Sequence, residues 1–168
     1  DLTTFGKIIG AGMPVGAYGG RREIMEMVSP VGAVYQAGTL SGNPVAMAAG
    51  IAQLTYLKEH PEVYTKLNKT ADSFFSELQK IVDESGRGYQ VNHICSLGSM
   101  FCTTQEVYDY ETAKTSDTKA YADYCNYMQN HGIYLAPAQF EAMFISAAHT
   151  QEQLAQTLET ARNYFKNN

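Results

Sequence analysis

Residues 61–86 read PEVYTKLNKTADSFFSELQKIVDESG, and this stretch decides the fold class. Its apolar residues recur at spacings of three and four: Val63, Leu67, Ala71, Phe74, Leu78 and Ile81. That spacing places them on one face of a helix, while lysines and glutamates occupy the rest of the circumference. Pro61 is suited to open the helix and Gly86 to end it. We predict a long helix that lies on a core.

Short strands follow this helix. Four strands are predicted, over residues 89–95, 99–104, 133–135 and 143–147. The first two are expected to meet at Leu97-Gly98, and the polar residues 104–115 predict a loop. A small sheet covered on one face by helices, an α/β two-layer sandwich, is the simplest architecture for this order of elements.

Two more helices are predicted in this layer. Ser116 is expected to cap a helix over residues 117–131, which Gly132 ends. Thr150 and Gln153 have the spacing of a capping box at the start of the last helix. The apolar stripe of that last helix consists of Leu154, Leu158, Ala161 and Phe165.

The first 60 residues have a different character. Glycine occupies positions 6, 10, 12, 16, 19 and 20, a density that permits unusual backbone angles and a close approach of the main chain to a flat or bulky group. We predict a short strand over 15–18 and a short helix over 21–28. Asn43 and Pro44 are a strong start signal for a helix over 44–59. That helix is apolar nearly all round, so its own protein or a partner subunit must cover it.

Composition limits the kinds of partner and site. The 168 residues have a net charge of −5 with scattered lysines and arginines, so we expect no binding of nucleic acid. The apolar stretch 45–57 is shorter than the roughly 20 residues of a membrane span, so we expect no membrane partner. Three cysteines, an odd number without a signal-peptide pattern, favour the cytoplasm. No metal is expected, because the four histidines are dispersed and His93 with Cys95 makes only two of the four usual zinc ligands.

Lys7 differs from an ordinary solvated lysine because of its neighbours. Gly6 and Gly10 enclose Lys7 and the apolar Ile8 and Ile9, which indicates a half-buried pocket. Burial disfavours the ammonium form and would lower the pKa of the amine from about 10.4 toward the range of a nucleophile. A lysine that forms a Schiff base is therefore the most specific interpretation of this loop.

Two phosphate-binding motifs fit the same loop poorly. Ile8 follows Gly6-Lys7 where a Walker motif has Ser or Thr, and the earlier glycine of that motif is missing. Gly10-Ala11-Gly12 lacks a third glycine at the right spacing, and Pro14 interrupts the expected helix. A dinucleotide-binding fingerprint is therefore also a poor match.

Three motifs resemble one enzyme family. Residues 1–20, which end in MPVGAYGG, are similar to the lysine segment of the class III aminotransferases of fold type I. Residues 35–44, YQAGTLSGNP, and residues 134–142, YLAPAQFEA, are similar to the glutamate-1-semialdehyde aminomutase branch of that family. The resemblance covers essentially the whole chain, with the motifs in the same order.

This resemblance implies an activity and a set of site residues. The protein would be a homodimer that uses pyridoxal 5'-phosphate to convert a small amino aldehyde, glutamate-1-semialdehyde, to 5-aminolevulinate for tetrapyrrole synthesis. Lys7 would form the Schiff base with the cofactor and transfer protons. Gly38 and Thr39 would approach the cofactor phosphate of the neighbouring subunit, and Glu141 would lie at the substrate end of the site.

The resemblance also implies a division of the chain. Residues 1–42 would be the trailing part of a large cofactor-binding domain, 43–60 a linking helix, and 61–168 the small domain. Because the sequence starts as if in the middle of a domain, we expect a C-terminal fragment. The family's partner for the pyridine nitrogen and its ring-stacking aromatic would precede Lys7. We therefore expect the fragment alone to be inactive and free of cofactor.

Two other functions stay open. A class III ω-aminotransferase exchanges amines between two substrates, and many such enzymes bind a substrate carboxylate with an arginine of the small domain. Arg87, beside a helix end, and Arg162, on the last helix, do not suit that task, which favours the aminomutase. The remaining alternative is an isolated α/β domain without catalytic activity.

Overall fold

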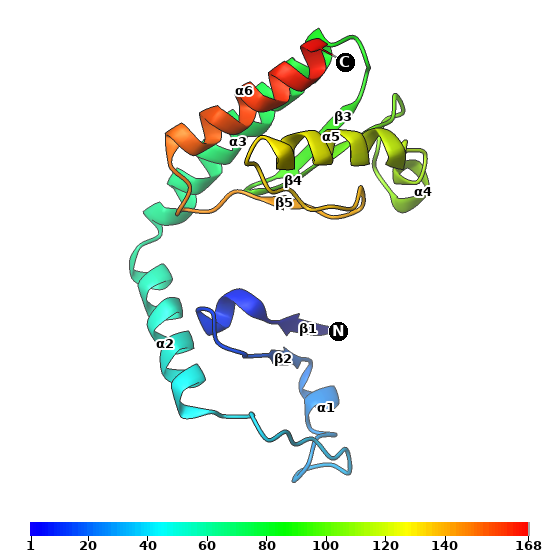
Figure 1. Ribbon diagram of the computed structural model, residues 1–168. Helices are drawn as coiled ribbons and strands as arrows, with labels where there is room; N and C mark the ends of the chain where they lie inside the picture. Colours follow the sequence, from blue (N-terminus) through cyan, green and yellow to red (C-terminus); the bar gives the residue numbers. More distant parts are fainter. Residues whose placement is uncertain (168) are drawn as a thin grey trace. The chain divides into compact units, whose positions relative to one another are not determined.

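The computed structural model describes residues 1–167, and the chain forms two compact units (Figure 1). The N-terminal unit comprises Asp1–Pro61 and contains a two-stranded sheet. The C-terminal unit begins at Glu62 and contains a three-stranded sheet. The assignment of these units to parts of a large and a small domain remains a prediction.

The C-terminal unit is an antiparallel sheet with helices on one face (Figure 1). Its strands, in the order β3-β4-β5, are β3 (Gln90–Ile94), β4 (Leu97–Phe101) and β5 (Met143–Phe144). Its long helices are α3 (Glu62–Glu84), α5 (Thr118–Asn130) and α6 (Gln151–Asn167). Helix α3 packs on β3 and on α6, and α6 also packs on α5. The predicted α/β two-layer sandwich is confirmed.

The core of this unit lies between the sheet and the helices. Along β4, Gly98 and Met100 are buried and their neighbours are only half-buried, because successive residues of a strand face opposite sides of the sheet. Phe75 of α3 is fully buried above Gly98. A Cβ atom on Gly98 would lie 2.4 Å from Cε1 of the Phe75 ring, so the ring occupies the space that any larger residue would need.

The predicted ends of α3 and α6 agree with the structure. Helix α3 begins one residue after Pro61, and Gly86 follows its end with a φ of +70°. The N–H of Thr150 donates to Oε1 of Gln153 at 2.9 Å, and the N–H of Gln153 donates to the Thr150 hydroxyl at 3.2 Å. These two bonds satisfy donors that a helix leaves free in its first turn, so the capping box is confirmed.

The predicted cap of α5 is wrong by one residue. Asp117, not Ser116, caps the helix: its carboxylate accepts hydrogen bonds from the N–H groups of Lys119 and Ala120 at 2.9 and 3.0 Å. A carboxylate is the stronger acceptor and also suits the positive end of the helix dipole. The hydroxyl of Ser116 is buried without a hydrogen-bond partner among the described residues.

The predicted strands need three corrections. Leu97 and Gly98 belong to β4, and the turn lies before them at Cys95, whose φ is +50°. Residues 133–135 form no strand, because the chain there still closes the end of α5 through the bond from Ile133 N–H to the Met128 carbonyl at 2.9 Å. The last strand is limited to the two residues of β5.

A short helix, α4 (Tyr110–Ala113), lies in the stretch that was predicted to be a loop. The Asp109 carboxylate accepts from the Thr112 N–H at 2.8 Å, and the Thr112 hydroxyl accepts from the Asp109 N–H at 3.1 Å. This reciprocal pair is a capping box. One helical turn is too short for an apolar period, so the Asp-x-x-Thr spacing is its only signal in the sequence.

The N-terminal unit is built around a hairpin. Strands β1 (Leu2–Phe5) and β2 (Ala17–Gly20) pair antiparallel, and a 3-10 helix, η1 (Lys7–Gly10), lies in their connection. The predicted strand 15–18 corresponds to β2, while β1 was not predicted. Helix α1 (Arg22–Met25) is shorter than the predicted helix 21–28.

Helix α2 (Pro44–Glu59) has the predicted bounds and cap. The Asn43 side chain accepts hydrogen bonds from the N–H groups of Val45 and Ala46, both at 3.1 Å. Ala46 and Gly50, one turn apart, are buried, and α2 contacts η1. Other apolar residues of this helix are exposed, Ile51 by 66%, so α2 offers an apolar surface that the N-terminal unit does not cover.

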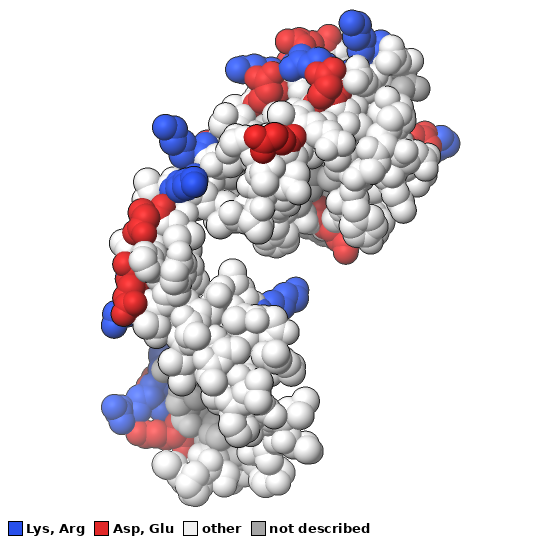
Figure 2. All heavy atoms as spheres, turned by 60° about the vertical axis from the view of Figure 1, so that its left-hand side comes forward, with Lys and Arg blue, Asp and Glu red and all other residues white. Residues whose placement is uncertain are grey.

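Charged side chains of both signs stand side by side on the C-terminal unit, whereas a broad surface of the N-terminal unit shows no charged group in the view of Figure 2. One network joins α3 and α6, in which Arg162 pairs with Glu77 at 2.7 Å and with Glu84 at 2.9 Å.

None of the helices within residues 1–167 is long and apolar enough to cross a membrane.

Replacing Phe75 by alanine should destabilise the C-terminal unit by about 3 to 5 kcal/mol, because it removes a buried ring and leaves a cavity above Gly98. The matched control is Phe144→Ala on β5, where the ring is 69% exposed and the loss should stay within about 0.5 kcal/mol. Urea unfolding followed by tyrosine fluorescence measures both, since the chain has no tryptophan. Equal losses for the two variants would contradict the position of the core.

Candidate active site

Lys7 begins the 3-10 turn that connects β1 to β2. Its backbone has a φ of +50°, in the left-handed region that is unfavourable for a residue with a side chain. Such a conformation costs about 1 to 2 kcal/mol and persists only when the surroundings impose it. Residues held in this way occur often at active sites. Ala11 and Cys95 have the same φ of +50°, so this conformation accompanies tight turns of the chain and does not by itself single out Lys7.

Hydrogen bonds within the turn hold this conformation. The N–H of Ile9 donates to the Gly6 carbonyl at 3.4 Å, and the N–H of Ala11 donates to the Ile8 carbonyl at 3.1 Å. The N–H of Met13 then donates to the carbonyl of the buried Gly10 at 2.9 Å. The backbone around Lys7 is therefore a connected series of tight turns.

The expectation that Lys7 is half-buried is wrong for this chain. Lys7 and Ile8 are exposed, and they line an open hollow of about 520 Å³ with Gly12, Met13 and Pro14. Only one side of η1 is buried, because η1 packs on α2 through Gly10. Lys7 lies on the side of η1 that remains exposed. Glycine neighbours in a sequence permit close packing but do not by themselves supply the covering surface.

Gly38 and Thr39 lie in a turn that leads into α2. The Ser41 N–H donates to the Gly38 carbonyl at 2.9 Å, and a Cβ atom on Gly38 would lie 3.0 Å from the Ser41 hydroxyl oxygen. Both Gly38 and Thr39 are exposed. The turn therefore presents a backbone and a hydroxyl group that are chemically able to bind a phosphate.

The groups of the N-terminal unit fit pyridoxal phosphate. The cofactor needs a primary amine for its aldehyde carbon, and the exposed Lys7 makes no ion pair within residues 1–167. It also needs donors for its phosphate, which the turn at Gly38-Thr39 offers. Lys7 of one subunit, with Gly38 and Thr39 of its neighbour, would hold the group.

Glu141 lies in a loop of the C-terminal unit that is fastened to the sheet. The buried Gln139 accepts from the Cys102 N–H at 3.1 Å and donates to the Met100 carbonyl at 2.7 Å, so its amide continues the pairing of β4. The Glu141 carboxylate accepts from the Ala138 N–H at 3.2 Å within the same loop. The role of Gln139 was not predicted, because its only signal in the sequence is a polar residue between the apolar Ala138 and Phe140.

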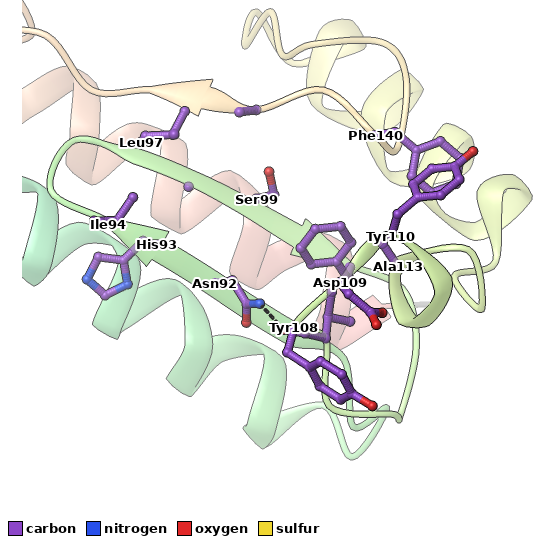
Figure 3. Close-up of a pocket in the computed structure, with 14 residues that line it drawn as sticks. Asn92, His93, Ile94, Leu97, Ser99, Tyr108, Asp109, Tyr110, Ala113 and Phe140 are labelled. Atoms are coloured by element: carbon purple, nitrogen blue, oxygen red, sulfur yellow. Dashed lines mark hydrogen bonds between the residues drawn. The ribbon is translucent and has the colours of Figure 1, made fainter. Parts of the chain in front are cut away.

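A cavity of about 470 Å³ lies on the face of the sheet that the helices do not cover (Figure 3). Asn92, Leu97 and Ser99 project into it from β3 and β4, and Tyr110 and Phe140 border one end. The residues on either side of Glu141 line this cavity, and the Ser99 hydroxyl donates to the Glu141 carbonyl at 3.4 Å. Glu141 thus stands at the border of the open sheet face.

The four arginines all have partners within their own unit. Arg21 and Arg22 pair with carboxylates of the N-terminal unit. Arg162 belongs to the network with Glu77 and Glu84. The guanidinium carbon of Arg87 lies 5.8 to 6.0 Å from the centroids of three rings, those of Tyr89, Tyr164 and Phe165. Arg87 and Arg162 are therefore engaged by structural contacts.

Other reactive groups are poorly suited to catalysis. Burial raises the pKa of the Cys102 thiol to about 12, so this group stays a neutral thiol near neutral pH. Within residues 1–167, no three side chains of His, Cys, Asp or Glu lie close enough together to hold a metal ion.

Gly50 is a further residue that the sequence analysis did not single out. It is buried in the interior of α2, where glycine lowers helix stability relative to alanine. A single glycine inside a helical pattern usually has a packing reason, and that was the available signal. The packing partner is the backbone of η1.

Comparison with known proteins adds to this geometry. A sequence model of the family described as Aminotransferase class-III matches residues 1–163. The chain is 61% identical over 166 residues to glutamate-1-semialdehyde 2,1-aminomutase 1 of Lachnoclostridium phytofermentans, a match that covers 99% of this chain and 39% of that protein. The chain thus spans about two fifths of the length of the curated relatives it matches.

Several solved structures share its fold, two of which are an aminotransferase and an aminomutase. A β-phenylalanine aminotransferase from Variovorax paradoxus matches with a TM-score of 0.88 and 28% identity, over 99% of this chain and 38% of that one. A glutamate-1-semialdehyde-aminomutase from Pseudomonas aeruginosa matches with a TM-score of 0.83 and 19% identity, over 97% of this chain and 38% of that one. The second likeness shows the fold alone.

Lys7→Gly should be more stable than Lys7→Ala by about 0.5 to 1 kcal/mol, because glycine adopts a positive φ without strain. The comparison removes the amine in both variants, so it isolates the backbone. Thermal unfolding of the cofactor-free protein at its natural length measures the difference. Ala48→Gly on α2 is the control and should lose about 1 kcal/mol, as helix interiors do. A Lys7→Gly variant less stable than Lys7→Ala would contradict the left-handed conformation.

Proposed function

Because the chain belongs to the class-III aminotransferase family, we propose that its protein is a pyridoxal-phosphate-dependent isomerase that converts glutamate-1-semialdehyde to 5-aminolevulinate. The similarity to aminomutases over nearly the whole chain is the observation that supports this activity most. The exposed amine of Lys7 and the exposed hydroxyl of Thr39 are chemically able to serve the same cofactor.

In this proposal each site residue has a defined role. When bound, pyridoxal phosphate supplies an electron sink for a substrate carbanion. Lys7 Nζ would hold the cofactor covalently and, when free, would move protons between the reacting carbons. The Gly38 N–H and the Thr39 hydroxyl bind the phosphate of the neighbouring subunit. Glu141 lies toward the substrate.

A homodimer is part of this proposal. The exposed apolar residues of α2, including Val45 at 63% and Ile51 at 66%, support a partner surface there. A second copy of the chain is the proposed partner, because the phosphate-binding turn leads directly into this helix. The cytoplasm is the proposed location, since the three cysteines form no disulfide within residues 1–167.

An ω-aminotransferase is the second candidate, because a β-phenylalanine aminotransferase is among the structures that share the fold. An arginine that binds a substrate carboxylate would favour it. Arg87 is engaged by aromatic rings and Arg162 by two carboxylates, so neither is free for that task. This favours the isomerase. An assay with glutamate-1-semialdehyde alone separates the two, because only the isomerase needs no second substrate.

Lys7→Ala should abolish the absorption band of the lysine-bound cofactor and reduce turnover by several orders of magnitude, on the order of 10⁴-fold or more. The experiment uses the protein at its natural length, loaded with pyridoxal phosphate. Lys58→Ala on α2 is the matched control, because it removes an exposed lysine of the same unit. A normal band in Lys7→Ala would exclude the proposed role of Lys7.

Thr39→Val should weaken binding of pyridoxal phosphate by about 1 to 3 kcal/mol, because valine keeps the shape of threonine and removes one hydrogen bond to a charged acceptor. Equilibrium dialysis measures the dissociation constant, with Thr55→Val on α2 as a control that should leave it unchanged. Unchanged affinity in Thr39→Val would refute the phosphate role.

A mixed dimer tests whether Thr39 acts across the subunit boundary. If it does, a dimer of one Lys7→Ala subunit and one Thr39→Val subunit has one site with both changes and one site with neither. Such a dimer should bind cofactor at one site with normal affinity and show about half the normal turnover per dimer. If Thr39 serves its own subunit's Lys7, every site is defective and no normal site appears.

A further inference from the structure

We propose that Gly50 is a positioning residue for Lys7: its missing side chain lets α2 contact the backbone of η1 and so fixes the turn that presents the lysine. The inference rests on the proposed function only in that Lys7 must bond to the cofactor. It adds Gly50 of α2, a residue outside the Lys7 turn, to the residues that position the amine.

The geometry of the contact is backbone against backbone. Helix α2 and η1 lie side by side in the N-terminal unit (Figure 1). A Cβ atom on Gly50 would lie 2.7 Å from the carbonyl oxygen of Ile9, 3.8 Å from its carbonyl carbon and 4.0 Å from the Cα of Gly10. Both Gly10 and Gly50 are buried.

A side chain at position 50 cannot be accommodated by a change of rotamer. The nearest atom belongs to the main chain of Ile9, so either α2 or η1 must move as a whole. Alanine at this position would otherwise favour the helix, since glycine is the poorer helix former. The presence of glycine therefore indicates that contact with η1 outweighs helix propensity here.

A displacement of the Ile9 backbone is expected to alter the backbone at Lys7, because the two residues are close in sequence and a hydrogen bond spans them. Ile9 is two residues from Lys7, and its N–H donates to the carbonyl of Gly6, the residue before Lys7. Lys7 itself has a φ of +50°, which tolerates little adjustment because the left-handed region is narrow. A shift of the Ile9 carbonyl must therefore change the direction in which the lysine leaves the chain.

The test is Gly50→Ala in the protein at its natural length, with two measurements besides turnover. The first is the rate constant at which Lys7 forms its adduct with added pyridoxal phosphate, followed by absorbance. The second is the pH midpoint of the absorption change of that adduct. We expect the rate constant to fall by about tenfold to a hundredfold, as misplacement of reacting groups does, and the pH midpoint to shift. Gln53→Ala, on the same helix, should leave both at the wild-type values.

A second variant covers the case in which Gly50→Ala does not fold. Ala46→Gly lies on the same buried face of α2 one turn earlier, and removing its methyl group loosens that face. It should also shift the pH midpoint. Wild-type rate constants and pH midpoints in the variants that fold would overturn the inference.

These outcomes are separate from the fate of the proposed function. If Lys7→Ala still forms the adduct, the role of Lys7 fails whatever Gly50→Ala does. If Lys7→Ala abolishes the adduct while Gly50→Ala behaves as the wild type, only the positioning role of Gly50 fails. If the protein lacks aminomutase turnover but Gly50→Ala alters the adduct, the inference stands.

Discussion

The N-terminal unit depends on the close contact between α2 and η1, the turn in which Lys7 has a left-handed backbone. A residue with a side chain loses about 1 to 2 kcal/mol in that region, so the surroundings must impose it. Two of them do so here: the hairpin, in which Phe5 pairs with Ala17, and the close contact between the Ile9 carbonyl and Gly50. The lysine is thereby held at a sharp corner of the chain, exposed and without an ion pair within the described residues.

The C-terminal unit has a filled core on one face of its sheet and an open surface on the other face. Phe75 packs onto Gly98 on the covered face of the sheet, while Leu97 and Ser99 face the cavity on the other side. Gln139 fastens the loop that contains Glu141 to the edge of β4. The two-layer packing and the Gln139 hydrogen bonds thus leave one sheet face uncovered, with the Glu141 loop at its border.

The sequence predicted what local chemistry determines. The cap at Asn43, the capping box at Thr150 and the apolar period of α3 are short-range signals, and the corresponding helices were found. Strand ends depend on pairing with distant residues, which explains why the turn was placed at Leu97-Gly98 when β5 in fact pairs there. The sequence also does not predict the positive φ of Lys7, because that backbone angle depends on contacts with residues distant in the sequence.

The sequence predicted which residues belong to the candidate site, but it did not predict how exposed they are or what they pack against. Residue types and motif order led to Lys7, Gly38, Thr39 and Glu141, whereas the exposure of Lys7 and the role of Gly50 follow from packing that no spacing rule contains. The central claim is that Lys7 is the residue bonded to the cofactor. Borohydride reduction of the cofactor-loaded protein at its natural length, followed by mass spectrometry of its peptides, tests this most directly. The reduced adduct should lie on the peptide that contains Lys7, whereas an adduct on any other lysine would rule out this role of Lys7.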